Sequence, residues 1–133
     1  MARVRQSGTA PELVVRQLLR SMDIAYRIGG KGLPGRPDLC NRRRGWAIFV
    51  HGCYWHQHTG CSRATTPKNN ASFWAEKFVA NRRRDARAVR DLRRMGLRVL
   101  IVWECEVKND RAGAKLRRFF AQPSEGQTTR PSR

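Results

Sequence analysis

An apolar segment, Trp46-Ala-Ile-Phe-Val50, is the feature that most limits how this chain can fold. Five apolar residues in a row, without alternation, are typical of a short strand that is buried on both faces. A similar segment, Leu97–Val102, follows a region over residues 71–95 that has apolar residues at helical spacing. Buried strands joined through a long helix favour an α/β domain with three layers, in which helices flank a central mixed sheet.

Helix signals are also found near both ends of the chain. Thr9-Ala-Pro-Glu12 is a capping-box pattern and predicts a helix from about Ala10 to Met22. Its apolar residues are expected to face the core, and they are Leu13, Val14, Leu18, Leu19 and Met22. A last helix is expected over residues 111–121, followed by a polar tail, 122–133, that we expect to be disordered.

The region between the first helix and the buried strand predicts short strands and a loop. Ile24–Ile28 is a strand candidate, the Gly- and Pro-rich segment 29–37 predicts a loop, and Asp38 is expected to open the next strand. In the long helix, which Gly96 should end, one stripe is predicted to pack on the core while most arginines lie elsewhere. The stripe consists of Trp74, Phe78, Val89 and Leu92.

The charge of the chain favours a polyanionic partner. The 28 Lys and Arg against 10 Asp and Glu leave a formal net charge of +18, which indicates nucleic acid as the partner. The run Arg82-Arg-Arg84 would then contact phosphates when nucleic acid is bound, and would form a solvated face without it. No apolar run approaches the roughly 18–20 residues of a membrane span, and the N-terminus lacks a signal-peptide pattern. We therefore expect a cytoplasmic protein with reduced cysteines.

The segment 51–61 holds all three histidines and two of the four cysteines. Cys53, His58 and Cys61 are spaced so that one loop can surround a tetrahedral Zn²⁺ ion, which a fourth, distant residue would complete. A site with four protein ligands has no open coordination position. Such a site would organise the loop, and catalysis would have to use other residues.

Spacing leaves part of this zinc site open. Either Cys40 or Cys105 could be the fourth ligand, and spacing does not decide between His56 and His58 as the imidazole ligand. The alternative interpretation is that the cysteines are ordinary buried residues beside an unrelated histidine.

Candidate catalytic residues lie on both sides of this loop. Asp38 could hold Mg²⁺ against a phosphate, although Pro-Asp after a glycine turn is also ordinary turn chemistry. His51 and His56, where they are not zinc ligands, could activate water and hold the phosphate. Tyr54 and Trp55 are expected either to pack in the core or to stack on bases. For Trp74, which lies in the predicted long helix, core packing and base stacking are equally good interpretations.

Six ordered motifs are spread over nearly the whole chain up to about Val107. They are Thr9-Ala-Pro-Glu-Leu13, Leu33-Pro-Gly-Arg-Pro-Asp38, Phe49-Val-His-Gly-Cys-Tyr-Trp-His56, Phe73-Trp-Ala-Glu-Lys77, Asn81-Arg-Arg-Arg-Asp85 and Val102-Trp-Glu-Cys105. Through these motifs the chain resembles the very-short-patch-repair (Vsr) mismatch endonucleases. The resemblance implies a fold like that of restriction endonucleases, a structural zinc, and nicking of DNA 5′ to the T of a T:G mismatch left by deamination of 5-methylcytosine.

The resemblance also implies a role for individual residues. Asp38 would ligate Mg²⁺ together with the backbone carbonyl of Val50, and His56 would be the base that activates water. His51 would assist at the phosphate, and Glu12 would help to order water at the ion. The implied zinc ligands are Cys53, His58, Cys61 and Cys105. The expected DNA contacts are Tyr54, Trp55, Trp74, Arg36, Asn81 and Arg82.

The chain departs from the family pattern in three ways, and from restriction-type active sites in a fourth. Val50 stands where members often have Thr, which preserves the main-chain carbonyl but not the hydroxyl. Thr59-Gly60 makes the zinc loop one residue longer. Residues 1–8 would be a shortened N-terminal arm. Val50-His51-Gly52 replaces the acid-x-Lys half of restriction-type sites, so histidine would activate the water.

Together these features predict a monomeric, Mg²⁺-dependent, zinc-stabilised nicking enzyme with its domain over residues 1–121. It would act on double-stranded DNA, leave a 5′-phosphate and a 3′-hydroxyl, and associate with the nucleoid when bound. It would be functionally linked to a C5-cytosine DNA methyltransferase and to mismatch-repair proteins. The alternatives are a restriction-type nuclease with sequence specificity and an inactive, zinc-stabilised DNA-binding module.

Overall fold

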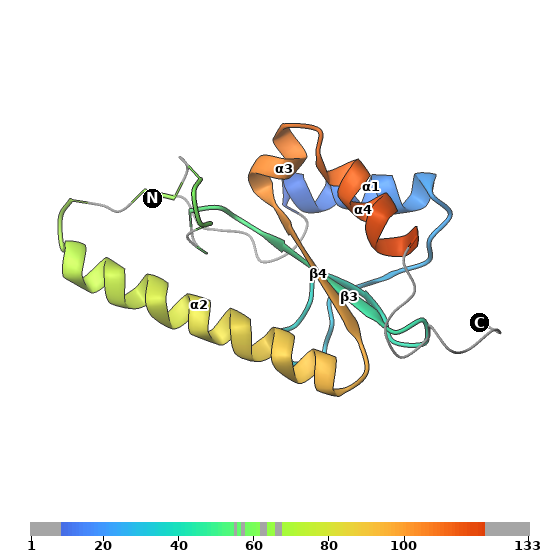
Figure 1. The fold of residues 1–133 in the computed structure, drawn as a ribbon, viewed down its shortest axis with the longest axis horizontal. Helices are drawn as coiled ribbons and strands as arrows, with labels where there is room; N and C mark the ends of the chain where they lie inside the picture. Colours follow the sequence, from blue (N-terminus) through green and yellow to red (C-terminus); the bar gives the residue numbers. More distant parts are fainter. Residues whose placement is uncertain (1–8, 55, 57, 62–63, 66–67, 122–133) are drawn as a thin grey trace.

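Four strands form one mixed sheet in the order β1-β2-β3-β4 (Figure 1). The strands are β1 (Arg27–Ile28), β2 (Leu39–Asn41), β3 (Trp46–His51) and β4 (Arg98–Trp103). The first two pairs of neighbours are antiparallel, and β3 and β4 are parallel. This computed structural model describes residues 9–54, 56, 58–61, 64–65 and 68–121.

Helices cover both faces of the sheet. The helices α1 (Ala10–Ser21), α3 (Glu104–Lys108) and α4 (Ala112–Ala121) lie together on one side, and the long α2 (Ala71–Arg94) lies on the other (Figure 1). One buried cluster joins α1 and α4 to residues of β2, β3 and β4, and a second joins α2 to the opposite face of β2 and β3. The predicted three-layer α/β arrangement with a mixed sheet is therefore confirmed.

The buried strand agrees with its prediction, and the long helix agrees in its extent and in two residues of its stripe, since Trp74 and Val89 are only partly buried. Four consecutive residues of β3, Trp46–Phe49, are buried, as the unbroken apolar run indicated. On α2, Phe78, Ala88 and Leu92 are buried and the arginines lie mostly outside this stripe. The helix ends before Gly96, whose φ of 89° is a conformation that glycine adopts without strain. None of the described helices is long and apolar enough to cross a membrane.

Two expectations for the first part of the chain were wrong or too long. The strand candidate Ile24–Ile28 is reduced to Arg27–Ile28. On α1, Leu13 and Val14 are 45% and 37% exposed, so they do not face the core. The buried stripe of α1 runs through Glu12, Val15 and Leu19 instead. A carboxylate occupies the first position of this stripe, and a search for apolar periodicity passes over it.

The strand ends place the chemically important residues together. Asp38 directly precedes β2, His51 is the last residue of β3, and Trp103 is the last residue of β4. His51 and Trp103 are partners in the parallel register. The Thr9 hydroxyl caps α1 by accepting a hydrogen bond from the Glu12 N–H at 3.4 Å, which begins α1 beside the same end of the sheet. Residues from three strands and two helices thus meet at one place.

Candidate active site and cysteine–histidine cluster

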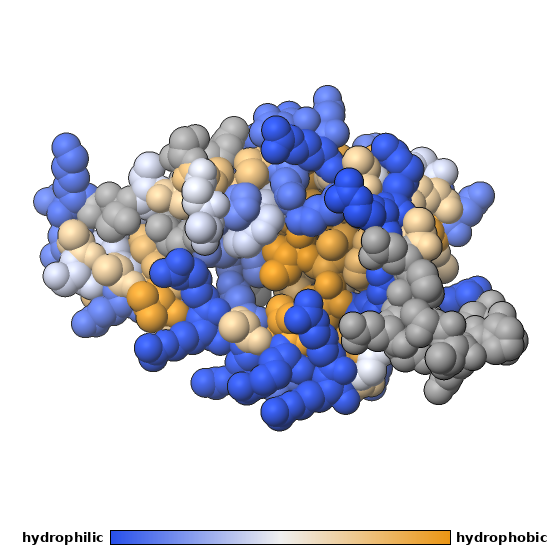
Figure 2. Space-filling model, in the orientation of Figure 1, coloured by the Kyte–Doolittle hydropathy of each residue, from blue (hydrophilic) through white to orange (hydrophobic). Residues whose placement is uncertain are grey.

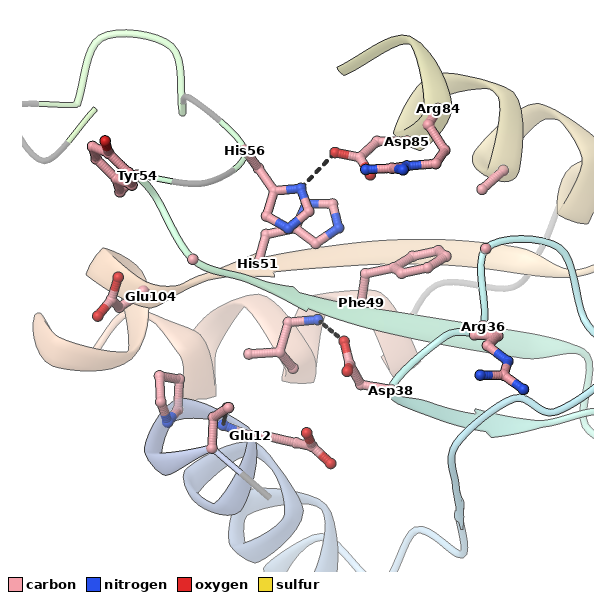
Figure 3. Close-up of a pocket in the computed structure, with 16 residues that line it drawn as sticks. Glu12, Arg36, Asp38, Phe49, His51, Tyr54, His56, Arg84, Asp85 and Glu104 are labelled. Atoms are coloured by element: carbon pink, nitrogen blue, oxygen red, sulfur yellow. Dashed lines mark hydrogen bonds and ion pairs between the residues drawn. The ribbon is translucent and has the colours of Figure 1, made fainter. Parts of the chain in front are cut away.

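A cleft of about 640 Å³ opens where α1, the start of β2, the end of β3 and α2 meet (Figure 3). It is lined by acidic, basic and aromatic side chains from segments far apart in the sequence. Among its lining residues are Glu12, Arg36, Asp38, His51, His56 and Asp85. Figure 3 shows the two imidazoles between Asp85 on one side of the cleft and Asp38 on the other.

Asp38 is a half-buried carboxylate that is held by the backbone. Its Oδ2 accepts a hydrogen bond of 2.7 Å from the N–H of Val50. The pKa of Asp38 is raised from 3.8 to about 6. Burial is the largest cause and the nearby carboxylate of Glu12 adds to it, whereas the hydrogen bond from the Val50 N–H opposes the rise. Glu12 is only 1% exposed and is ion-paired with Arg16. Two acidic groups close together in one partly desolvated cleft form an environment that favours a cation.

His51 and His56 form a stacked pair on the other side of Asp38. Their ring centroids are 3.8 Å apart and their planes differ by 5°. His51 is 5% exposed, and burial lowers its pKa to about 4; the charge of His56 lowers it further, and Asp85 opposes both. His51 is therefore neutral at pH 7. Among the described residues, no group hydrogen-bonds the buried Nδ1 of His51.

Asp85 is a site residue that the sequence analysis did not single out. Its Oδ2 lies 2.6 Å from Nδ1 of His56. Burial raises the pKa of Asp85, but the hydrogen bond and charge of His56 outweigh this effect, so the pKa is lowered. Asp85 lies seven residues from both Phe78 and Leu92, on the buried stripe of α2. A carboxylate in the middle of an apolar stripe is the signal that could have identified it.

A second group of residues lies beside the cleft, and we call Cys53, His58, Cys61 and Cys105 the cysteine–histidine cluster. Their ligand atoms all lie within 4.8 Å of one another. Nδ1 of His58 is 3.7 Å from Sγ of Cys53 and 3.4 Å from Sγ of Cys105. The Cys105 N–H also donates to Sγ of Cys53 at 3.4 Å.

The other candidate ligands lie elsewhere. Cys40 is buried in β2 among Leu33, Ala47 and other apolar residues on the α2 side of the sheet. His56 points at Asp85 (Figure 3). The structure therefore distinguishes the candidates that spacing left open. Cys105 belongs to the cluster and Cys40 does not, and His58 belongs to it while His56 lies in the cleft.

Trp103 connects the cluster and the cleft. Its ring stacks on His58 with centroids 4.1 Å apart and planes 8° apart. The same indole meets His51 edge to face at 5.2 Å. It also lies edge to face with His56 at 6.4 Å. A single side chain at the end of β4 therefore contacts imidazoles of both sites.

The expected DNA contacts are distributed over several surfaces. Tyr54 and Arg36 line the cleft, and Tyr54 packs edge to face on Phe78 at 5.5 Å. The ring centroids of Trp74 and Phe78 are 6.1 Å apart. Arg82 lines a smaller pocket on the other side of the histidine pair, and Asn81 is on the same turn of α2. Trp55 lies outside the described residues.

A carboxylate pair, a neutral buried imidazole and a histidine–aspartate pair in one cleft of a strongly basic protein define a nuclease-like site. A sequence model of the family described as DNA mismatch endonuclease Vsr matches residues 1–63. The chain is 39% identical to "DNA mismatch endonuclease Vsr" of Escherichia coli (strain K12) over 108 residues, which are 81% of this chain and 69% of that protein.

Two bacterial nicking enzymes are also similar. "Type II nicking enzyme V.XorIIP" of Xanthomonas oryzae pv. oryzae is 43% identical over 109 residues, covering 82% of this chain and 79% of the relative. "Type II nicking enzyme V.NmeAIP" of Neisseria meningitidis is 37% identical over 109 residues, covering 82% of this chain and 77% of the relative. The chain belongs to the Vsr family of DNA mismatch endonucleases, and it is accordingly a DNA endonuclease.

Proposed function

We propose that this endonuclease nicks one strand of duplex DNA 5′ to the T of a T:G mismatch by Mg²⁺-dependent hydrolysis, and so initiates very short patch repair. The observation that carries the proposal is the convergence of Asp38, His56 and Asp85 on one cleft in a chain of this family. The names of the relatives, a mismatch endonuclease and nicking enzymes, support cleavage of a single strand at a mismatch.

Asp38 and the carbonyl of Val50 are the proposed Mg²⁺ ligands. The raised pKa of Asp38 and the adjacent Glu12 fit a cation, whose charge would offset theirs. The register pairs Leu39 with Ile48, and its extension by two residues would pair Pro37 with Val50. Proline has no backbone N–H, so it cannot donate to the Val50 carbonyl as a strand partner would. When bound, Mg²⁺ supplies positive charge at the scissile phosphate.

His56 is the proposed general base, and Asp85 is its positioning residue. The carboxylate of Asp85 accepts a hydrogen bond from Nδ1–H of His56, which leaves Nε2 of the neutral ring able to accept a proton from water. The charge of Asp85 also stabilises the imidazolium that results, as in other histidine–carboxylate pairs.

His51 and Glu12 complete the proposed catalytic set. Because burial keeps His51 neutral, its imidazole can hydrogen-bond a phosphate oxygen without adding a second positive ring beside His56. Glu12 is fixed by its ion pair with Arg16 and lies close enough to Asp38 to raise its pKa. It is therefore positioned to accept hydrogen bonds from water near Asp38.

The cysteine–histidine cluster is the proposed site of a structural Zn²⁺. Sulfur and nitrogen ligands of a tetrahedral zinc are roughly 3.6 Å apart, and the separations from His58 to Cys53 and Cys105 are 3.7 and 3.4 Å. Burial raises the pKa of the Cys53 thiol to about 12, so a bound cation would be needed to hold it as a thiolate. Four protein ligands leave no open position, which supports a structural role.

The proposed DNA contacts divide into stacking and phosphate groups. Tyr54, Trp55 and Trp74 would stack on or wedge beside the mismatched bases, since aromatic rings tolerate any base. Arg36, Asn81 and Arg82 would contact the backbone or base edges. Arg36 lines the cleft with a left-handed φ of 50°, which points to a tightly turned segment next to Asp38.

The biological setting is part of the same proposal. The catalytic domain would span residues 1–121 and act as a monomer on the nucleoid in the cytoplasm. A C5-cytosine DNA methyltransferase would create the 5-methylcytosine whose deamination yields the mismatch. Mismatch-repair proteins would act on the nicked product.

Nicking of a labelled duplex with one T:G pair, compared with its T:A control, tests the proposal. Each strand is labelled in turn, and Mg²⁺ is added or omitted without a chelator that would strip zinc. We expect a Mg²⁺-dependent cut 5′ of the T on one strand of the mismatched duplex alone. Cutting of both strands of the T:A duplex would favour a restriction-type nuclease. Binding without cutting by a folded, zinc-loaded protein would indicate an inactive DNA-binding module.

A further inference from the structure

One side of α2 carries a straight row of arginines that no site described so far uses. Arg83, Arg87, Arg90 and Arg94 are spaced by four, three and four residues, and we call them the arginine stripe. At about 100° per residue they fall within about 60° of one another around the helix. All four side chains are exposed.

The arginine stripe faces away from the sheet. The buried residues Phe78, Ala88 and Leu92 lie on the opposite side of α2 by the same helical geometry. In Figure 2, hydrophilic side chains gather along the outer edge of the molecule where Figure 1 shows α2. These charges do not support the core, so packing does not explain them.

Ion pairs within the protein neutralise little of this charge. Among the described residues, the one ion pair of the stripe joins Arg90 to Asp91 at 3.6 Å, and both side chains are substantially exposed. An exposed pair of this kind contributes about 0–1 kcal/mol. The other three arginines of the stripe thus have no carboxylate partner in the described part of the chain, in a protein with a formal net charge of +18.

The spacing of the stripe fits a phosphate backbone. From Arg83 to Arg94 the helix rises by roughly 16 Å, with neighbouring arginines roughly 5–6 Å apart along its axis. Duplex DNA presents one charge per about 3.4 Å of axis on each strand, and guanidinium groups bind phosphates in a bidentate manner. The stripe has no aromatic residues between its arginines, so it can contact the backbone but cannot stack on bases.

The stripe does not face the cleft. The cleft is lined by Arg84, Asp85 and Ala88 of α2, and Arg84 and Ala88 lie roughly 90–130° around the helix from the centre of the stripe. DNA bound by the stripe therefore lies outside the cleft. It is either the flank of a duplex that bends around α2 or a second duplex.

We infer that the arginine stripe is a second, sequence-independent binding surface for the phosphate backbone of DNA, separate from the nicking cleft. The inference rests on the proposed function only in taking DNA as the polyanion. It predicts that the stripe contributes to affinity and its salt dependence, and contributes nothing to turnover or to mismatch recognition.

The test compares two fourfold variants with equal loss of charge. The first is R83Q/R87Q/R90Q/R94Q. The control, R20Q/R111Q/R117Q/R118Q, removes four exposed arginines from the layer of α1 and α4 on the other face of the sheet. Glutamine is a good helix former, so both variants should fold. Circular dichroism and zinc content verify this before binding is measured.

Binding to a matched T:A duplex of about four helical turns is followed by fluorescence anisotropy over a series of salt concentrations. The slope of log K against log salt falls by roughly 0.9 for each phosphate that the protein no longer neutralises. We expect the stripe variant to show a slope that is roughly 2–4 units smaller on this duplex, and the control variant a slope that is less than one unit smaller. If the stripe holds the flank of the duplex that occupies the cleft, the two variants should match on a duplex of about one turn, which is too short to reach the stripe.

A second assay distinguishes the two sources of DNA. An immobilised one-turn duplex captures a labelled one-turn duplex only if the protein binds both at once. A smaller slope for the stripe variant on the long duplex, without capture by the wild-type protein, supports a bent flank. Capture by the wild-type and control proteins that the stripe variant loses supports a second duplex. Equal behaviour of the two variants in both assays would overturn the inference. Because neither assay requires nicking, an inactive wild-type protein would contradict the proposed function and leave this test intact.

Discussion

Replacing Asp38 by Asn should make the Mg²⁺-free protein more stable while it abolishes nicking. Burial raises the pKa of Asp38 from 3.8 to about 6, which means that the fold opposes the ionised carboxylate. A shift of roughly two units corresponds to about 3 kcal/mol. The Asn side chain keeps an oxygen that can accept the Val50 N–H, so the variant loses the charge but not the hydrogen bond.

The gain should depend on pH. Since the pKa of Asp38 is raised in the folded protein, the folded state binds this proton more tightly than the unfolded chain does. Asp38 therefore lowers stability progressively as the pH rises from 3.8 to about 6, and by a constant amount above that range. We expect a gain for the variant of up to about 3 kcal/mol at pH 8 and of about half as much at pH 5.

Thermal or urea unfolding at both pH values, in buffer without Mg²⁺ and without chelator, measures this difference. A gain of this size raises Tm by roughly 5–10 °C at pH 8. Added Mg²⁺ should stabilise the wild-type protein and not the variant. Asp110→Asn, at an exposed position outside the cleft, is the control and should change neither quantity. A variant that is less stable at pH 8, or equally stabilised at both pH values, would refute the reasoning.

Four further predictions concern the histidines, Asp85 and the cysteines. His56→Ala should lower the nicking rate at saturating DNA by roughly 10²–10⁴-fold. Asp85→Asn should lower it by roughly 10²-fold or more, because the amide favours the wrong tautomer of the His56 imidazole. Single-turnover assays measure both rates, with DNA affinity expected to be unchanged, and a normal rate would remove that residue from the mechanism. Cys61→Ala should lose one equivalent of zinc and much of its stability while Cys40→Ala keeps its zinc, as metal analysis and denaturation would show. The imidazole pKa of His51, followed by NMR, should be about 4; titration near 6.5 would contradict its burial.

The elements that could be predicted from the sequence are those whose burial is continuous or periodic. Trp46–Phe49 is buried on both faces, so every residue had to be apolar and the pattern was unambiguous. The long α2 repeats its stripe often enough for the period to be clear. The five-residue α3, Glu104–Lys108, was not predicted because it is too short to show any helical period.

The site residue that the sequence analysis did not single out, Asp85, is a polar residue in an apolar position. Glu12 occupies a similar position on α1, and it was expected at the site only through the family resemblance. Glu12 and Asp85 each lie on the buried stripe of a helix, where a search for hydrophobic periodicity treats them as interruptions. The contact between His56 and Asp85 spans 29 positions and depends on how α2 crosses the sheet. Spacing also could not decide between Cys40 and Cys105, because that choice depends on the parallel pairing of β3 with β4.

The parallel pairing of β3 with β4 has a consequence for how the protein folds. Contacts between His51 and Trp103, and between Cys53 and Cys105, join residues 52 positions apart through a crossover that contains all of α2. Such non-local contacts form slowly, because the intervening loop must close before they are made. A chain that is still folding carries the basic residues of α2 but lacks the completed cleft. We therefore expect competence to cut DNA to arise only after β4 has paired with β3.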